Sequence, residues 1–312
     1  MPDKVYLQVF DPKVVNYPAV KCVVGGSEVC VVYDPDLVSG SSMHAAVFVD
    51  ENALGNTIYR YPRAKRVCLL QESTTRGMHQ HADYLARKFD LVLTFDERLL
   101  KMGPPFQQFF YGTSWINRGR PAPDVLFAKN RLCTFIANVE HNSDFGYELR
   151  KQVAVMLRED SRVDCWGRGI RPFEFKDDVL PGSYFSIAME NTRQDLYFSE
   201  KLIDCLVTDT VPLYWGPPSI GDVFDVRGMI CFENIEQLQA EVKTLSVERY
   251  RSMLPYVEKN RMRAFELLLT GHETLVQRLA EQVLRSLPEK YKPLGPLARS
   301  RGAALLRKVK VF

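Results

Sequence analysis

Glu200 and Lys201 stand where a helix is expected to begin. Ser199 precedes them, and serine is favoured as a helix N-cap because its hydroxyl accepts a backbone N–H of the first turn. Both charged side chains would then lie beside unpaired N–H groups at the positive end of the helix dipole, where anions bind. Lys201 could neutralise a phosphate, and Glu200 could accept hydrogen bonds from two ribose hydroxyls. The alternative is an ordinary solvated first turn.

The neighbouring segments place this turn at the edge of a sheet. Residues 183–189 form an apolar run that predicts a buried strand, and Glu190 and Asn191 follow it directly. Residues 199–208 predict a helix, and residues 211–215 predict the next strand. Such strand–helix–strand units are parallel and right-handed, and ligands of open α/β sheets bind beyond the carboxyl ends of the strands. The two polar pairs, 190–191 and 200–201, are therefore expected in one site.

The rest of the chain alternates short apolar strands with helical patterns, which predicts an α/β fold with parallel sheets covered on both faces. Glycine and proline cluster between residues 103 and 123 and indicate a linker. We therefore expect a Rossmann-like domain at residues 1–128, a second one at residues 129–287 and a basic tail at residues 288–312. A ligand cleft is expected between the two domains.

Composition excludes several classes of protein. The 312 residues are 46% apolar and 25% charged, as in soluble globular proteins, and the net charge is +3. Five basic residues lie in the last fifteen, which contain no acid, and the remaining balance of 36 against 38 is −2, so a nucleic-acid binder is not expected. Residues 1–10 read as a strand rather than a signal peptide, and without an apolar run of about 18 residues no membrane-spanning helix is expected. Seven cysteines without a paired spacing suggest buried thiols in a reducing, cytoplasmic setting.

The polar segment described above resembles the donor-binding motif of the family-10 glycosyltransferases, the α1,3/α1,4-fucosyltransferases. The matching stretches are EN at Glu190-Asn191, YFSEKL at residues 197–202 and TVPLYWGPP at residues 210–218. The resemblance covers about forty residues. It implies a GT-B fold, made of two Rossmann-like domains, and transfer with inversion from a nucleotide sugar, which is GDP-fucose in characterised members. It also implies that neither a metal nor another cofactor is needed.

The resemblance assigns roles to individual residues of the motif. Tyr197 matches a tyrosine that lines the donor site. Glu200 matches a glutamate that holds the ribose, and Lys201 matches a lysine that contacts the diphosphate. Glu190 and Asn191 match a pair at the sugar end of the site.

An upstream arginine contacts phosphate in the family, a dozen or so residues after a Ser-Asn pair. Ala137-Asn138 stands in place of that pair here, which makes Arg150 the corresponding arginine. The alternative for Arg150 is a helix-surface side chain with no contact to a ligand.

Inverting transfer needs a general base that takes the proton of the acceptor hydroxyl. In the family this base is a glutamate just after a buried strand of the first domain, and Glu72 occupies that place after residues 66–70. The family's preceding glycine is replaced by glutamine and its following asparagine by serine. The alternatives for the base are Asp96, Glu97 and the imidazoles of His79 and His81.

Two further features carry open alternatives. Trp115, in the linker, could stack on a sugar ring or simply pack against apolar neighbours. The tail at residues 297–312 could lie on an anionic membrane as a basic amphipathic helix, or remain solvated. His79 and His81 have no further ligand at metal spacing, so no metal site is expected there.

The sequence thus favours an inverting glycosyltransferase that moves L-fucose from GDP-fucose to a hydroxyl of a glycan. One alternative is the same mechanism with another donor, a different GDP-hexose or UDP-xylose. Another is a non-catalytic module that binds a glycan or a nucleotide. The acceptor, the linkage and the oligomeric state do not follow from the sequence.

Overall fold

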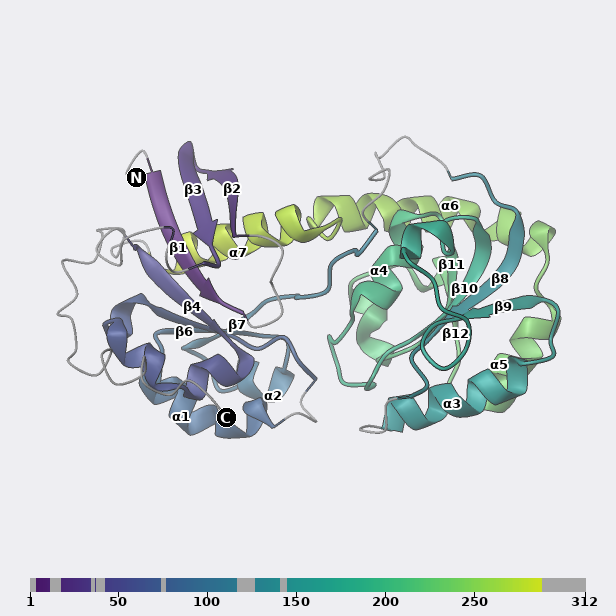
Figure 1. Cartoon of the computed structure of the whole chain (residues 1–312), viewed down its shortest axis with the longest axis horizontal. Coiled ribbons are helices and arrows are strands. Elements are labelled where there is room, and N and C mark those ends of the chain that lie inside the picture. The colour runs from purple at the N-terminus through teal and green to yellow at the C-terminus, as the bar shows by residue number, and fades with distance from the viewer. Residues whose placement is uncertain are drawn as a thin grey trace, which may run out of the picture.

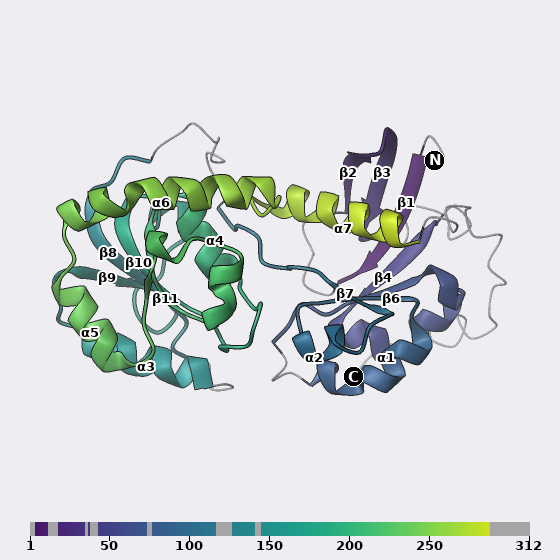
Figure 2. The ribbon, with the colours of Figure 1, turned by 180° about the vertical axis from the view of Figure 1, so that it is seen from behind.

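A computed structural model describes residues 4–11, 18–34, 37, 43–73, 77–116, 127–140 and 145–287. Its strands form two sheets that lie side by side along the longest axis of the molecule (Figure 1). An extended segment joins the halves on one side, and the long helices near the carboxyl terminus run past both of them (Figure 2).

The first sheet has seven strands in the order β2-β3-β1-β4-β5-β6-β7. They are β1 (Lys4–Phe10), β2 (Ala19–Val24), β3 (Ser27–Val32), β4 (Ala45–Val49), β5 (Arg66–Leu69), β6 (Leu91–Thr94) and β7 (Phe106–Gln108). All neighbours are parallel except β2 and β3, which form a hairpin around Gly25 and Gly26. Both glycines have positive φ, a conformation that other residues rarely adopt.

The second sheet has five parallel strands in the order β12-β11-β10-β8-β9. They are β8 (Arg131–Ile136), β9 (Val163–Trp166), β10 (Ser183–Met189), β11 (Val211–Trp215) and β12 (Ile230–Cys231). The bounds of β10 and β11 are those predicted from the sequence. Long apolar runs such as these are typical of parallel strands that are buried on both faces.

Helices cover both sheets. They are α1 (Ala82–Lys88), α2 (Glu97–Leu100), α3 (Phe145–Leu157), α4 (Glu200–Val207), α5 (Ile235–Lys243), α6 (Val247–Glu266) and α7 (His272–Ser286). On the second sheet, α4 and α6 lie on one face and α3 and α5 on the other (Figures 1 and 2). None of the described helices combines the length and apolar content that a crossing of the bilayer requires.

The helix α7 returns to the first sheet. Its buried side chains Val276, Leu279 and Val283 belong to the same core cluster as Val29 and Val31 of β3. Residues 272–286 fall within the range predicted for the second domain, 129–287, yet their apolar face packs on the strands of the first.

Two local expectations were wrong. The glycine- and proline-rich stretch from residue 103, predicted as linker, contributes β7, which pairs with β6 through Val92 and Phe106. Cys231, predicted as a buried thiol, is exposed on the short edge strand β12. The basic tail, residues 288–312, lies outside the described residues.

Candidate functional site

The N-terminus of α4 is built as the sequence predicted. Ser199 is the N-cap, and its Oγ accepts the backbone N–H of Lys201 at 3.4 Å. The same hydroxyl donates to Oε2 of Glu190 at 2.6 Å, and the backbone N–H of Ser199 donates to Oε1 at 2.9 Å. Glu190 is fully buried at the end of β10. Its carboxylate therefore fixes the first turn of α4 to the carboxyl edge of the sheet.

Three charged groups gather around this turn. The Nζ of Lys201 lies 3.1 Å from Oε1 of Glu200 and 3.9 Å from Oε2 of Glu190. Burial disfavours ionisation of Glu200, but Lys201 and Lys176 outweigh it and lower its pKa to about 2. Burial raises the pKa of Glu190, although Lys201 and Ser199 oppose that shift. Glu200 is thus held as a carboxylate, in contact with the ammonium group of Lys201 and influenced by the positive charge of Lys176.

Arg150 projects from α3 to the same edge. One guanidinium nitrogen donates to the carbonyl of Met189 at 2.6 Å and to Oδ1 of Asn191 at 2.7 Å. The side chain is 3% exposed, which excludes the helix-surface alternative. Gly146, at the start of α3, permits this approach, because a Cβ there would lie 2.6 Å from the carbonyl oxygen of Asn191.

Tyr197 is buried between these groups. Burial raises its pKa well above the usual value, and the charges of Glu190 and Glu200 add to that shift, while Arg150 opposes it. The structure thus brings together the six residues that sequence analysis placed in the second domain's site: Arg150, Glu190, Asn191, Tyr197, Glu200 and Lys201.

Glu72 lies just beyond the end of β5 in the first sheet, and its side chain is partly exposed. The buried carboxylate of Asp50 fixes the backbone there, since Oδ1 accepts the N–H of Gln71 at 3.0 Å and that of Glu72 at 3.3 Å. The turn that carries Glu72 is therefore held by a second strand end, that of β4.

Two of the alternative bases are engaged with each other. Nδ1 of His79 lies 3.2 Å from Oδ2 of Asp96, and Nε2 lies 3.1 Å from the carbonyl oxygen of Glu72. Both residues are buried, and Arg98 binds Asp96 as well. Burial lowers the pKa of His79, while Asp96 opposes that shift. These contacts make His79 a support for the turn that carries Glu72.

Sequence analysis missed a buried ion pair beneath α4. Asp204 is fully buried, and Oδ2 lies 2.5 Å from Nζ of Lys176 in η7 (Lys176–Asp178). Its Oδ1 accepts the hydroxyl of Ser114 and the backbone N–H of Trp115, each at 2.7 Å. The only signal in the sequence is that Asp204 follows Glu200 by four residues and so shares its helix face.

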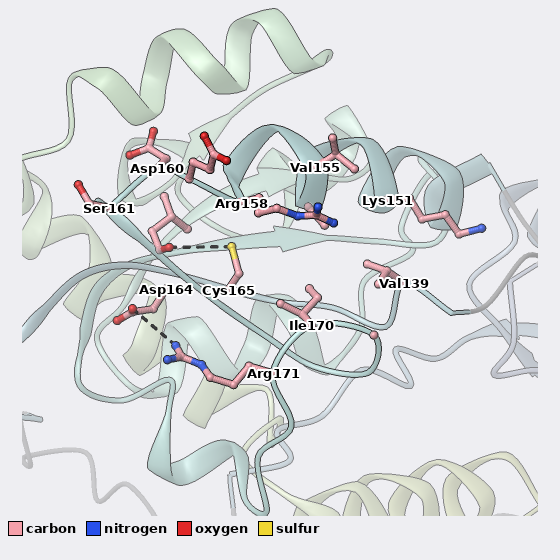
Figure 3. A pocket seen from close by; sticks show the side chains of 14 residues that line it. Val139, Lys151, Val155, Arg158, Asp160, Ser161, Asp164, Cys165, Ile170 and Arg171 are labelled. Carbon is pink, nitrogen blue, oxygen red and sulfur yellow. Dashed lines mark hydrogen bonds and ion pairs between the residues drawn. The ribbon is translucent and has the colours of Figure 1, made fainter.

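An open pocket of about 630 Å³ lies elsewhere, between α3 and the edge strand β9 (Figure 3). Its charged lining residues include Arg158, Asp160 and an ion pair between Arg171 and Asp164. None of the predicted site residues lines it. Among the described residues, no cluster of three or more His, Cys, Asp or Glu side chains is arranged to hold a metal ion.

Comparison with known proteins agrees with the resemblance in the motif. Residues 127–266 match the sequence model of glycosyltransferase family 10 (fucosyltransferase), C-terminal region. The alpha-(1,3)-fucosyltransferase FucT of Helicobacter pylori is 31% identical over 84 residues, a stretch that covers 25% of this chain and 18% of that relative. The resemblance to family 10 is therefore confirmed, on a region that contains all six residues of the α4 site.

Solved structures extend the likeness to the first half. A crystal structure of an alpha1,3-fucosyltransferase with GDP matches with a TM-score of 0.56 at 16% identity, covering 95% of this chain and 93% of that one. The Anabaena protein HepE, in complex with UDP and glucose, matches with a TM-score of 0.52 at 11% identity, covering 78% and 79%. The chain has the GT-B fold predicted from its sequence.

Proposed function

We propose that this chain, which carries a glycosyltransferase family 10 domain, transfers L-fucose with inversion from GDP-fucose to a hydroxyl group of a glycan. The observation that carries the proposal is the joint position of Glu190, Glu200 and Lys201. The buried carboxylate of Glu190 anchors a helix N-terminus that presents both a cation and a carboxylate.

The donor would bind at this turn. Lys201 and the N-terminus of α4 attract the diphosphate, because both supply positive charge. Arg150 would add a second cation from α3. Glu200 is ionised and accepts the ribose hydroxyls, and Tyr197, Glu190 and Asn191 line the end that holds the sugar. Two cations and a helix dipole can stabilise the leaving diphosphate without a metal ion, so transfer is expected to need none.

The acceptor would approach from the first domain. Glu72 takes the proton of the acceptor hydroxyl while the oxygen of that hydroxyl forms a bond to the anomeric carbon of fucose. The bond from that carbon to the phosphate oxygen breaks on the opposite face, and the electron pair leaves with GDP. The anomeric configuration is inverted, and Glu72 releases its proton to solvent before the next cycle.

A binding panel tests the donor assignment. GDP, GDP-fucose, GDP-mannose, UDP-glucose and UDP-xylose are titrated into the purified chain by calorimetry, with and without EDTA. We expect GDP and GDP-fucose to bind in both conditions. A UDP-sugar that binds more tightly would reassign the donor, and loss of GDP binding in EDTA would contradict a metal-free site. If no nucleotide binds, the chain is a glycan-binding module or has lost its activity.

A basic tail that touches a membrane also remains a prediction. Residues 288–312 lie outside the described residues, so the expectation rests on their sequence alone. Sedimentation of the chain with anionic vesicles, compared with a chain ending at residue 287, would test it.

A further inference from the structure

We infer that Trp115 forms the nucleobase platform of the donor site, on which the base of the bound nucleotide stacks. The inference rests on the proposed function, because it takes Glu200 as the group that holds the ribose. Nothing in the resemblance to family 10 or in the α4 motif assigns a residue to the base.

The Trp115 ring is exposed although its backbone is fixed. Its side chain leaves the residue 60% exposed, whereas the neighbouring Ser114 and Ile116 are 3% and 2% exposed. The backbone N–H of Trp115 donates to the buried carboxylate of Asp204 at 2.7 Å, and the Ser114 hydroxyl donates to the same oxygen. Of the two alternatives for Trp115, packing against apolar neighbours does not agree with this exposure. The Trp115 ring is thus exposed to solvent between two buried neighbours, Ser114 and Ile116.

The place of the ring agrees with the geometry of a nucleotide. Asp204 lies one turn beyond Glu200 on the same face of α4, and the Nζ of Lys176, which lies 2.5 Å from Oδ2 of Asp204, also interacts electrostatically with Glu200. The Nζ of Lys176 also lies 5.9 Å from the centre of the Trp115 ring. A nucleoside diphosphate carries its base at C1′ of the ribose and its phosphates on the 5′ carbon, at the other end of the sugar. If Lys201 takes the phosphates and Glu200 the ribose, the base points toward Lys176 and Trp115.

The Trp115 ring and the Lys176 ammonium group have the chemistry needed to bind a nucleobase. An aromatic ring offers a stacking face that every nucleobase can use, and a lysine is a donor for the carbonyl oxygen of guanine or uracil. Lys176 can still donate a hydrogen bond to a base, because its ammonium group has three N–H bonds and Asp204 accepts only one of them. Stacking thus contributes affinity, while Lys176 favours bases with a carbonyl edge.

The test compares two ligands that both contain a diphosphate, of which only one carries a base. GDP and inorganic pyrophosphate are titrated by calorimetry into the wild-type chain, Trp115→Ala and Trp115→Phe. Tyr59→Ala serves as the control, since Tyr59 is an aromatic residue of similar exposure, 57%, in the first half of the chain. We expect Trp115→Ala to weaken GDP about tenfold, the scale of one base–aromatic stack, and to leave pyrophosphate unchanged. Trp115→Phe should keep most of the affinity, and Tyr59→Ala all of it.

Fluorescence gives an independent readout. GDP should quench the tryptophan emission of the wild-type chain, and Trp115→Phe should remove most of that quenching while GDP still binds. Melting temperatures of the variants should match that of the wild type, because the ring is exposed.

Other outcomes separate this inference from the proposed function. If GDP binds the wild type and Trp115→Ala equally, the platform is refuted and the donor site stands. If Trp115→Ala weakens pyrophosphate as much as GDP, or raises only the KM for a glycan, the ring does not contact the base and the inference is equally refuted. If the wild type binds neither GDP nor any other nucleotide, the proposed function itself fails.

Discussion

The rings of Phe95 and Tyr197 meet edge to face, with their centroids 5.1 Å apart. Phe95 directly follows β6 of the first sheet, and Tyr197 precedes α4 of the second. The ring of His79 lies 5.3 Å from Phe95 on the other side, and its Nε2 contacts the carbonyl oxygen of Glu72. A continuous set of contacts therefore runs from the Glu72 turn to the α4 site.

Phe95→Leu should lower kcat more than it weakens donor binding. The substitution shortens the side chain that separates the Glu72 turn from Tyr197, and small displacements of a catalytic group are costly. We expect kcat to fall about tenfold while the Kd for GDP changes less than twofold. Phe89→Leu is the control, since Phe89 is also buried but lies in the core of the first half. Equal values of kcat for the two variants would show that the contact between the rings has no role in turnover.

Gly146→Ala should impair the donor site through the backbone. A Cβ at residue 146 would lie 2.6 Å from the carbonyl oxygen of Asn191 and 2.7 Å from that of Glu190, and backbone atoms cannot give way cheaply. We expect a loss of about 1–3 kcal/mol in the free energy of unfolding, and weaker GDP binding. Gly55→Ala should change neither, because its Cβ would meet only an ordinary contact at 3.4 Å. Urea unfolding and calorimetry measure both effects, and a wild-type-like Gly146→Ala would contradict this packing.

Glu200→Gln should change how stability depends on pH. The pKa of Glu200 is lowered from 4.5 to about 2 in the folded chain, so the folded state favours the carboxylate. The resulting stabilisation, up to about 3 kcal/mol, is fully present above about pH 4.5 and is lost as the pH falls toward 2. The wild type should therefore exceed Glu200→Gln in melting temperature at pH 6, and by less at pH 3.

Glu236→Gln provides the matched control for that measurement. Glu236 also lies in the first turn of a helix, α5, but its side chain is exposed. Its substitution should shift the melting temperature little at either pH. If the gap between the wild type and Glu200→Gln is the same at pH 6 and pH 3, the flanking lysines do not hold Glu200 ionised.

Asp204→Ala should destabilise the chain strongly. It leaves the largely buried ammonium of Lys176, whose side chain is 16% exposed, without its carboxylate and removes two hydrogen bonds to the linker. Loss of one partner of a buried pair costs about 3–5 kcal/mol. The double variant Asp204→Leu with Lys176→Met should recover part of this loss, because it buries no unpaired charge.

The partly exposed pair Glu241–Arg249, at 2.7 Å, is the control for Asp204. Glu241→Ala should cost less than about 1 kcal/mol, as for other solvent-accessible ion pairs. Denaturant unfolding compares the variants. A loss no larger for Asp204→Ala than for Glu241→Ala would mean that the ion pair does not fix the linker to α4.

Local signals were enough to predict the strands, the helix and the N-cap that position the residues around α4. Ser199 is a strong N-cap, and the runs of β10 and β11 are apolar and bounded by turn residues, so each element could be read without its partners. The tertiary contacts that these elements make with distant parts of the chain could not be predicted from the sequence. The buried position of Arg150 depends on Gly146 meeting a neighbouring strand end, which no periodicity in the sequence encodes.

The misjudged positions share a cause. β7 has only three residues and exists because β6 offers it a free edge, not because its sequence has strong strand propensity. Packing against apolar neighbours was one of the two alternatives for Trp115, but its ring is exposed while its backbone N–H is bound to the buried Asp204. In both cases a tertiary contact overrode the preference of the local sequence.

The most direct test of the central claim follows the anomeric proton of fucose by NMR. GDP-fucose is incubated with a set of glycan acceptors and the wild-type chain in EDTA, and with Glu72→Gln in parallel. The account predicts that the wild type releases GDP and forms a fucoside whose anomeric configuration is opposite to that of the donor. It also predicts that Glu72→Gln binds GDP with unchanged affinity but forms product at least a hundredfold more slowly. Retention of configuration, or undiminished turnover by Glu72→Gln, would contradict it.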